Sequence, residues 1–323
     1  MSAIYTSAQL RKKFADKKWI MPYSRLTSVV DSRSNNVLYI EEYGPSEGVF
    51  VEGWRALHYP ATSHLVKKTY REGAATVAIL KQGKATLQLT PSFAPFGISE
   101  CQVNEKNVYL TFEGLGGAGV SSSFSRGMSE GVESVTVHSD GGGAKVGSST
   151  ISLPRKHILM IGVDDTDNDE EGATYALVDT ITKEICKKLE IRYLSHVNVQ
   201  LYPYNKHKTR NCFATMVGVI YEKPEQKEQV VTYFKEQLAQ HTLSEQTAMA
   251  VYEGFDLPCE FIDYCTSLKF RMATDIDELR NIAISAGVEL YEITGERGLF
   301  GAIGSLGYWN RPDFAAKLPS QCQ

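Results

Sequence analysis

The first half of the chain alternates short apolar runs with turn-forming residues, a pattern that is typical of β-strands. The runs 75–80 and 85–90 flank a polar turn, and the runs 101–103 and 108–112 flank Asn104–Asn107. Both arrangements predict β-hairpins, because two strands joined by a short turn pair in antiparallel fashion.

Other segments of this half extend the same pattern. A further pair of strands is expected near residues 26–43, and His64–Arg71 is expected to form a short helix. The sequence thus predicts a mostly antiparallel sheet domain with few helices over residues 1–153.

One compositional outlier lies within this half. Residues 114–147 contain four glycines before Ser121–Ser123 and three more at Gly141–Gly143. A glycine-rich turn that runs into a helix, here over Val120–Met128, could bind an anion through backbone N–H groups. The composition is equally typical of a flexible connector, and both interpretations stay open.

The pattern changes after Pro154–Lys156, where helical spacing of apolar residues becomes frequent. The expected elements are, in chain order, a strand at 157–163, a helix at 171–189, strands at 192–202 and 212–221, a helix beginning at Pro224 and a strand at 247–252. This β-α-β-β-α-β order is that of ferredoxin-like domains. A last helix is expected at 275–286, with Asp275 as its N-cap and Gly287 at its end. We therefore predict an α+β protein whose second domain, residues 154–323, is ferredoxin-like.

Composition narrows the class of protein. The 323 residues (35.9 kDa) suffice for two domains, and the formal charge of −4 leaves no global basic field for nucleic acid. The six cysteines form no CxxC pair, which argues against a zinc knuckle and fits free thiols in a reducing compartment. No apolar run is long enough to cross a membrane and no signal-peptide core is visible, so we expect a cytoplasmic protein with no membrane partner.

The most informative stretch ends the first strand of the second domain, where Asp164, Asp165 and Asp167 place three carboxylates in four residues. Carboxylates at this spacing suit Mg²⁺, a hard cation usually held by one or two carboxylates together with substrate phosphates. In the predicted fold they lie at the open edge of the sheet, close to Thr174 at the start of the next helix. The alternative is that Asp167–Glu171 merely cap this helix.

Two further segments carry candidate phosphate ligands. Tyr202–Asn211 includes Lys208 and Arg210, whose charges can bind phosphate oxygens, although the segment could also be a solvated hairpin tip. Gly295–Gly307 combines Arg297 with glycines that permit close backbone approach. The alternative for these glycines is a helix that packs tightly on its neighbour.

These three motifs, in this order, resemble the kinase-type domain of archaeal tRNA-isoleucine agmatidine synthetase. Gly162–Asp167 followed by Thr174 resembles its aspartate motif, Lys208–Asn211 its KTRGN segment, and Arg297–Ala302 its RGLIGA segment. The likeness covers roughly residues 157–308 and implies that the ferredoxin-like domain is of kinase type.

The sequence also departs from that family. Asn211 stands where the family has glycine, and Ala173 replaces a cysteine before Thr174. The anticodon-reading OB-fold and the zinc ribbon of the family have no counterpart in this sequence.

The resemblance implies ATP and Mg²⁺ as cofactors. The implied metal ligands are Asp164, Asp165 and Asp167, and the implied catalytic residues are Asp164, Asp165 and Thr174, the last as the phospho-acceptor or as a neighbour of the γ-phosphate. The implied nucleotide and phosphate ligands are Thr166, Lys208, Arg210, Asn211, Arg297 and Gly298. Phosphoryl transfer needs mainly positioning and charge compensation, which such a set can supply.

The overall layout is similar to that of the methanogenesis marker protein 11 family, whose members carry a Gly-Leu-Gly-Gly-Ala-Gly-Val segment, here Gly114–Val120, upstream of a DDTD motif. This resemblance implies an archaeal source and a link to methanogenesis. We therefore hypothesise an ATP- and Mg²⁺-dependent phosphoryl-transfer enzyme that activates a substrate in methanogenesis.

Two alternatives stay open. The first is a non-catalytic, nucleotide-binding assembly or maturation factor for methyl-coenzyme M reductase. The second is a tRNA-modifying enzyme, for which the acidic pI near 6.0 is unfavourable. Exposed sheet edges would also permit a homodimer.

Overall fold

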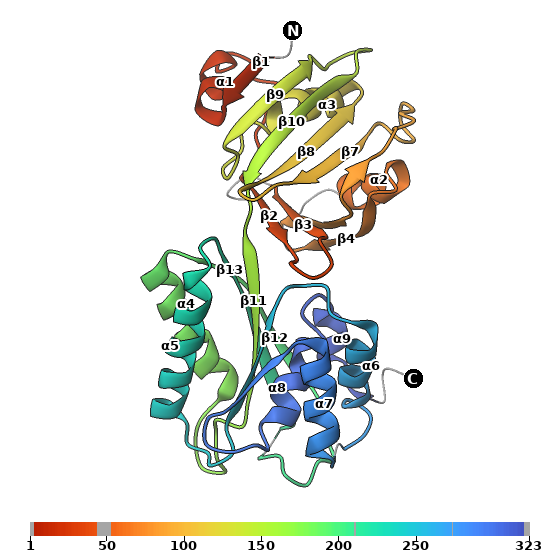
Figure 1. Cartoon of the computed structure of the whole chain (residues 1–323). Helices are drawn as coiled ribbons and strands as arrows, with labels where there is room; N and C mark the ends of the chain where they lie inside the picture. The colour runs from red at the N-terminus through yellow and green to blue at the C-terminus, as the bar shows by residue number, and fades with distance from the viewer. Residues whose placement is uncertain (1–2, 44–52, 210, 273, 320–323) are drawn as a thin grey trace. The chain divides into compact units, whose positions relative to one another are not determined.

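The computed structural model describes residues 3–43, 53–209, 211–272 and 274–319 of the chain. The chain forms two compact units, Met1–Lys156 and His157–Gln323, and Figure 1 shows the elements of each. Both units combine helices with antiparallel sheets, which confirms the α+β class. Among the helices of the described ranges, none has both the length and the apolar character that a membrane crossing requires.

The described part of the first unit contains two sheets. Their strand orders are β1-β9-β10-β8-β7-β6 and β2-β3-β5-β4. The strands are β1 (Ala3–Thr6), β2 (Arg25–Val30), β3 (Val37–Glu42), β4 (Val66–Glu72), β5 (Ala75–Leu80), β6 (Gly83–Lys84), β7 (Phe96–Val103), β8 (Asn107–Gly114), β9 (Ser134–Ser139) and β10 (Gly147–Pro154). The helices are α1 (Ser7–Lys13), α2 (Trp54–Thr62), α3 (Gly116–Val120) and the π-helix η1 (Ser121–Ser125). Buried side chains from both sheets, such as Tyr39 of β3 and Phe112 of β8, pack in one core.

The helix expected at residues 64–71 is wrong. This segment is strand β4, which pairs antiparallel with β5. Its residues Val66, Thr69 and Tyr70 are of types that favour strands, and pairing with β5 supplies backbone hydrogen bonds. A helix this short has little stability of its own to compete with that pairing.

The two hairpins predicted in this unit have different outcomes. The hairpin of residues 75–80 with 85–90 is wrong, because β5 pairs with β3 and β4 while β6 pairs with β7. The hairpin around residues 104–107 is confirmed, since β7 pairs with β8 and the Asn104 side chain accepts hydrogen bonds from the backbone N–H groups that follow. The strand pair expected near 26–43 is also confirmed as β2 and β3.

The glycine-rich segment 114–147 is folded, so the flexible-connector interpretation is wrong. It contains α3, η1 and β9, and its helix begins at Gly116 rather than at Val120. A Cβ on Gly119 would lie 2.7 Å from the Gly114 carbonyl oxygen, closer than real Cβ contacts. The glycines therefore let the helical segment pack directly against backbone. The anion-binding interpretation stays a prediction.

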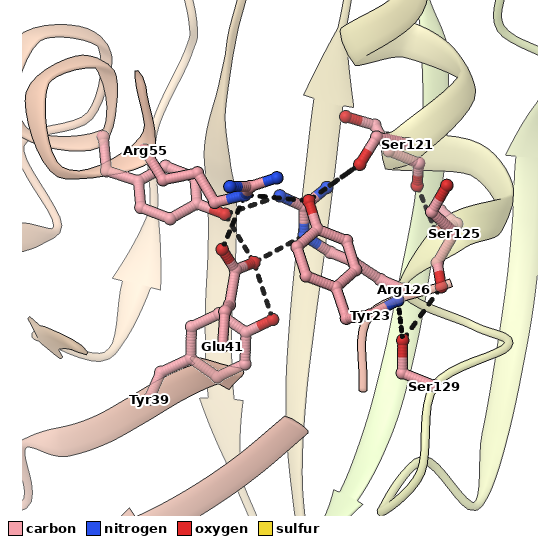
Figure 2. A network of polar contacts seen from close by, with 11 residues as sticks. Tyr23, Tyr39, Glu41, Arg55, Ser121, Ser125, Arg126 and Ser129 are labelled. Carbon is pink, nitrogen blue, oxygen red and sulfur yellow. Dashed lines mark hydrogen bonds and ion pairs between the residues drawn. The ribbon is translucent and has the colours of Figure 1, made fainter. Parts of the chain in front are cut away.

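A buried polar network joins β3, α2 and the residue that follows η1. The Glu41 carboxylate accepts hydrogen bonds from Arg126 Nε (2.7 Å), Tyr59 (2.7 Å) and Tyr39 (2.9 Å), and Arg55 Nε lies 3.3 Å from its other oxygen. Figure 2 shows this carboxylate beside the guanidinium groups of Arg55 and Arg126. Because η1 packs on β8 and β10 while β3 belongs to the smaller sheet, the network ties both sheets together.

The described part of the second unit is built on one antiparallel sheet with the strand order β12-β13-β11-β14-β15. The strands are β11 (His157–Asp164), β12 (Arg192–Gln200), β13 (Phe213–Tyr221), β14 (Ala248–Glu253) and β15 (Glu289–Glu292). The helices α4 (Thr174–Leu189) and α5 (Glu225–His241) cover one face, and α8 (Leu299–Leu306) packs on the other, together with α6 (Cys259–Ser267), α7 (Ile276–Ala286) and α9 (Pro312–Ala316).

The two faces of β11 explain this layering. Leu159, Ile161 and Val163 are buried against the helices α4 and α5. Gly162 points the other way, where a Cβ would lie 2.7 Å from the Ser305 hydroxyl of α8. Only glycine lets α8 approach the strand this closely.

The predicted ends of α7 and the predicted C-terminal end of α4 at Leu189 are confirmed, while the predicted start of α4 is wrong. The Asp275 side chain accepts hydrogen bonds from the N–H groups of Asp277 and Glu278, and Gly287 ends the helix with φ 81°. Helix α4 begins at Thr174 rather than near residue 171. Gly172 has φ 106°, a conformation that helical residues do not adopt, and this delays the start of the helix.

Candidate functional site

The aspartate motif lies where β11 ends. Asp164 is the last residue of the strand, and Asp165 follows with φ 58°, in the left-handed region that non-glycine residues rarely occupy. Such strained residues persist where the surrounding structure holds them, often at functional sites. The Thr247 hydroxyl bonds to the Asp165 carbonyl oxygen and helps to hold this turn.

Helix α8 closes the other side of this motif. A Cβ on Gly301 would lie 2.8 Å from Asp164 Cβ and closer still to its carboxylate. The glycine is therefore what makes room for the Asp164 side chain beneath the first turn of α8. The packing-helix interpretation of the segment 295–307 thus fits its glycines.

Arg297, just before α8, forms an ion pair with Asp165. Its Nε lies 3.1 Å from Asp165 Oδ2, and the two side chains are 38% and 15% exposed. The contact joins two of the three sequence motifs. Since Arg297 is more than one third exposed, solvent screens this pair, and its value lies in positioning.

The electrostatics of the three aspartates favour a cation. Burial, and next the charge of Asp165, raise the pKa of Asp164 well above its ordinary value. Burial also raises the pKa of Asp165, although Arg297 opposes this, and burial raises the pKa of Asp167. A positive charge brought near the motif would relieve this repulsion and desolvation.

The fit to Mg²⁺ is partial. Carboxylate oxygens are the donors that Mg²⁺ prefers, and one or two of them suffice beside phosphate and water. However, no group of three His, Cys, Asp or Glu side chains converges to hold a metal within the described ranges. Asp164 and Asp165 carry donors of the kind that Mg²⁺ prefers, while their role as metal ligands, and that of Asp167, stays a prediction.

Thr174 is bound to the same turn through its hydroxyl group. Its Oγ1 accepts hydrogen bonds from the Thr166 hydroxyl (3.0 Å) and the Thr166 N–H (3.4 Å), and both threonines are buried. The N-cap of α4 is Ala173, which makes no side-chain capping bond. The alternative that Asp167–Glu171 cap this helix is therefore wrong.

A cavity of about 710 Å³ opens at this edge of the sheet. The predicted site residues that line it are Asp164, Asp165, Asp167, Thr174, Lys208, Asn211 and Arg297. Thr166 and Gly298 are buried and do not line it, and the prediction for Arg210 falls outside the described residues. Residues from all three motifs, far apart in the chain, thus share one cavity.

Sequence reasoning missed part of the cavity wall. Asn198 and Thr215 line it from β12 and β13, and Arg271 lines it from the segment after α6. The two strand residues are register partners, a relation that depends on the pairing of β12 with β13 and that no local sequence pattern shows. Arg271 lies in no motif, and only the fold brings it here.

The comparisons with known proteins agree with this location. The sequence model of the TiaS TCKD domain matches residues 160–227, which span β11, α4, β12 and β13. This match confirms the agmatidine synthetase-like character predicted for the C-terminal part. Over this segment the second unit is thus similar to the TiaS TCKD domain.

A relative covers almost the whole chain. The uncharacterized protein MJ0921 of Methanocaldococcus jannaschii is 33% identical over 297 residues, which is 92% of this chain and 97% of that protein. The chain therefore belongs to the MJ0921 family. Because that protein is uncharacterized, the resemblance to the methanogenesis marker family stays a prediction.

Solved structures of TiaS are more distant. The complex of TiaS with an isoleucine tRNA and ATP has a TM-score of 0.42 and 18% identity, and apo TiaS, a tRNA agmatidine synthetase, has a TM-score of 0.41 and 16% identity. The matches cover 47% and 46% of this chain but only 36% and 35% of the TiaS chains, so this chain spans about a third of their length.

Proposed function

We propose that this protein is an ATP-dependent enzyme that modifies an RNA, with tRNA as the first candidate, by phosphoryl transfer in the second unit. The observation that carries the proposal is the coincidence of the TiaS TCKD match, 160–227, with the strands that hold the aspartate motif and the cavity. The tRNA-modifying alternative is thus better supported than the link to methanogenesis, for which neither the family model nor the relative gives support.

ATP would bind with its phosphates at the aspartate end of the cavity. Lys208 and Arg297 line this region, and their charges can neutralise phosphate oxygens. Asp164 and Asp165 would hold Mg²⁺, whose chemistry when bound is to neutralise phosphate charge and orient the nucleotide. Asp165 also fixes Arg297 through the ion pair, so the Arg297 guanidinium is in place before the nucleotide binds.

Thr174 is the proposed phosphorylated residue. Its hydroxyl lies on the cavity wall at the first residue of α4 and is held by Thr166. A threonine at this place could carry the phosphoryl group before its transfer to the substrate. The direct route, from ATP to a substrate oxygen, is the alternative for the same site.

The architecture of the proposed enzyme follows from the second unit. The consecutive elements β11, α4, β12, β13, α5 and β14 have the βαββαβ order, and the sheet order β12-β13-β11-β14 supports a ferredoxin-like arrangement. We propose that this domain is catalytic and that the β-rich first unit binds the substrate or a protein partner.

The experiment is ATP turnover with RNA. Purified protein is incubated with Mg²⁺-ATP and total tRNA, and ³¹P NMR follows ADP or AMP formation. RNA-dependent turnover is expected, and Asp165→Asn should lower it at least tenfold, because the carboxylate loses its charge. The matched control Asp263→Asn removes an exposed carboxylate of α6 that does not line the cavity and has no predicted role. Equal turnover of Asp165→Asn and wild type contradicts the role of Asp165 as a metal ligand. Turnover that does not depend on added RNA contradicts RNA as the substrate.

A further inference from the structure

A chain of polar side chains between α4 and the sheet ends at the cavity. His196 Nε2 of β12 lies 2.7 Å from Thr215 Oγ1 of β13, and Asp179 Oδ1 of α4 lies 3.7 Å from His196 Nδ1. Thr215 Oγ1 lies 2.9 Å from Asn198 Oδ1, and both of these residues line the cavity. None of the four belongs to the three sequence motifs.

The chain is held in place by its surroundings. Thr215 is only 1% exposed, and its carbonyl oxygen accepts a hydrogen bond from the Ser305 hydroxyl of α8 at 3.1 Å. The Asp179 carboxylate accepts a hydrogen bond from the Tyr193 hydroxyl (3.0 Å) and pairs with Lys183 one helical turn away. The carboxylate is therefore oriented beside the imidazole.

The Thr215 hydroxyl has one proton and two close acceptors, His196 Nε2 and Asn198 Oδ1. A third acceptor, the Val197 carbonyl oxygen, lies 3.5 Å away. The hydroxyl can donate to His196 Nε2 when the imidazole is neutral, or to Asn198 Oδ1 when the protonated imidazole donates to it. A hydroxyl placed in this way can pass a proton from the cavity to the histidine. The acid–imidazole–hydroxyl order is the same as in hydrolytic triads, with threonine as the outer hydroxyl group.

We propose that Thr215, His196 and Asp179 form a proton relay that removes the proton from the substrate hydroxyl or amine that attacks in the cavity. This inference rests on the proposed function. As the nucleophile forms its bond to phosphorus, the bond from phosphorus to the leaving oxygen breaks and its electron pair leaves with that oxygen. The nucleophile's proton passes to Thr215 Oγ1, and the Thr215 proton passes to His196 Nε2. Asp179 stabilises the resulting imidazolium.

The protonation state of His196 suits a base. Burial lowers the pKa of His196 below its ordinary value; Asp179 raises it and Lys183 lowers it. The other titratable groups here are Tyr193 on the neighbouring part of β12 and Cys186 on α4, each with a raised pKa caused mainly by burial. They stay neutral and add no charge beside His196, and the lowered pKa of His196 favours the neutral imidazole that the relay needs as its base.

The test compares His196→Gln with a matched histidine. His138 Nε2 also lies 2.7 Å from a threonine hydroxyl, that of Thr150, but on an exposed face of the first unit. Wild-type kcat should fall as the pH drops through the His196 pKa. His196→Gln should lower kcat at pH 8 by about 100-fold or more and remove this acid limb, with the Kd for ATP within twofold. His138→Gln should keep the acid limb of wild type, because this histidine lies outside the second unit.

A second variant pair separates the relay from mere packing. Thr215→Val keeps the shape of the side chain without the hydroxyl and should lose kcat as His196→Gln does, while Thr215→Ser should keep most of it. If His196→Gln and Thr215→Val keep kcat and the acid limb, the relay is wrong.

A measurement that needs no turnover tests the relay even if the proposed function is wrong. Long-range ¹H–¹⁵N NMR of the wild-type protein at pH 8 should show His196 with its proton on Nδ1 and a free Nε2. A proton on Nε2 at that pH overturns the relay whether or not ATP is consumed. If no turnover is found but His196 has the expected tautomer, the proposed function is rejected and the relay geometry is not.

Discussion

The sharpest test of the site geometry is Gly301→Ala. Gly301 lies in the first turn of α8, and a Cβ there would be 2.8 Å from Asp164 Cβ and nearer still to the carboxylate. Real Cβ atoms essentially never approach heavy atoms closer than 3.0 Å, so the Asp164 side chain or the helix must move. The substitution therefore displaces a proposed metal ligand by adding one methyl group, at a residue that itself lines the cavity.

The expected magnitudes differ for stability and activity. Overpacking costs about 1–3 kcal/mol, and the better helix propensity of alanine returns about 0.5–1 kcal/mol, which leaves a net loss of at most about 2.5 kcal/mol. Displacement of a reacting group by about 1 Å can cost roughly 100-fold in rate. We therefore expect a folded protein with a much lower rate of ATP turnover.

The matched control is Gly304→Ala in the same helix. Its Cβ would meet the ends of flexible side chains, with Leu268 Cδ1 at 3.1 Å, and would leave Asp164 untouched. Urea unfolding and ATP turnover are measured for both variants. If Gly301→Ala turns over ATP within twofold of Gly304→Ala, Asp164 does not act in the site and the reasoning is refuted.

Three further predictions concern binding, phosphorylation and stability. Lys208→Ala should weaken ATP binding by about 1–3 kcal/mol if the contact is charge-assisted, whereas the exposed Lys206→Ala should not; equal calorimetric Kd values for both would move the phosphate site elsewhere. Thr174→Ala should abolish autophosphorylation, and phosphate found on another residue by peptide mass spectrometry would contradict the assignment. Glu41→Gln should destabilise the first unit by about 3–5 kcal/mol, because it leaves Arg126 buried without its counter-charge, as urea unfolding can measure. Burial raises the pKa of Glu41, but its arginine partners outweigh burial and hold this pKa below the ordinary glutamate value. The ionised Glu41 therefore contributes its full stabilisation above the ordinary glutamate pKa, and this contribution is lost as the pH falls below that value. A free energy of unfolding that does not change with pH in that range would argue against this contribution.

The sequence by itself determined the local structure of the second unit. The cap of α7 at Asp275 and its stop at Gly287 depend on neighbouring residues, and both were predictable. The strands β11 and β13 were visible because their apolar runs are continuous. The aspartate motif was also visible from neighbouring residues alone, because three carboxylates within four residues are unusual.

Only the tertiary structure decided the pairings. The segment 64–71 has no local feature that excludes a helix, and it is a strand because β5 offers a partner. Gly301 and Asp164 have no visible relation until α8 packs on β11, and Asn198 and Thr215 meet only through the register of β12 with β13. Periodicity and capping act over a few residues, whereas strand pairing and helix packing join distant residues by burying surface, which no local pattern encodes.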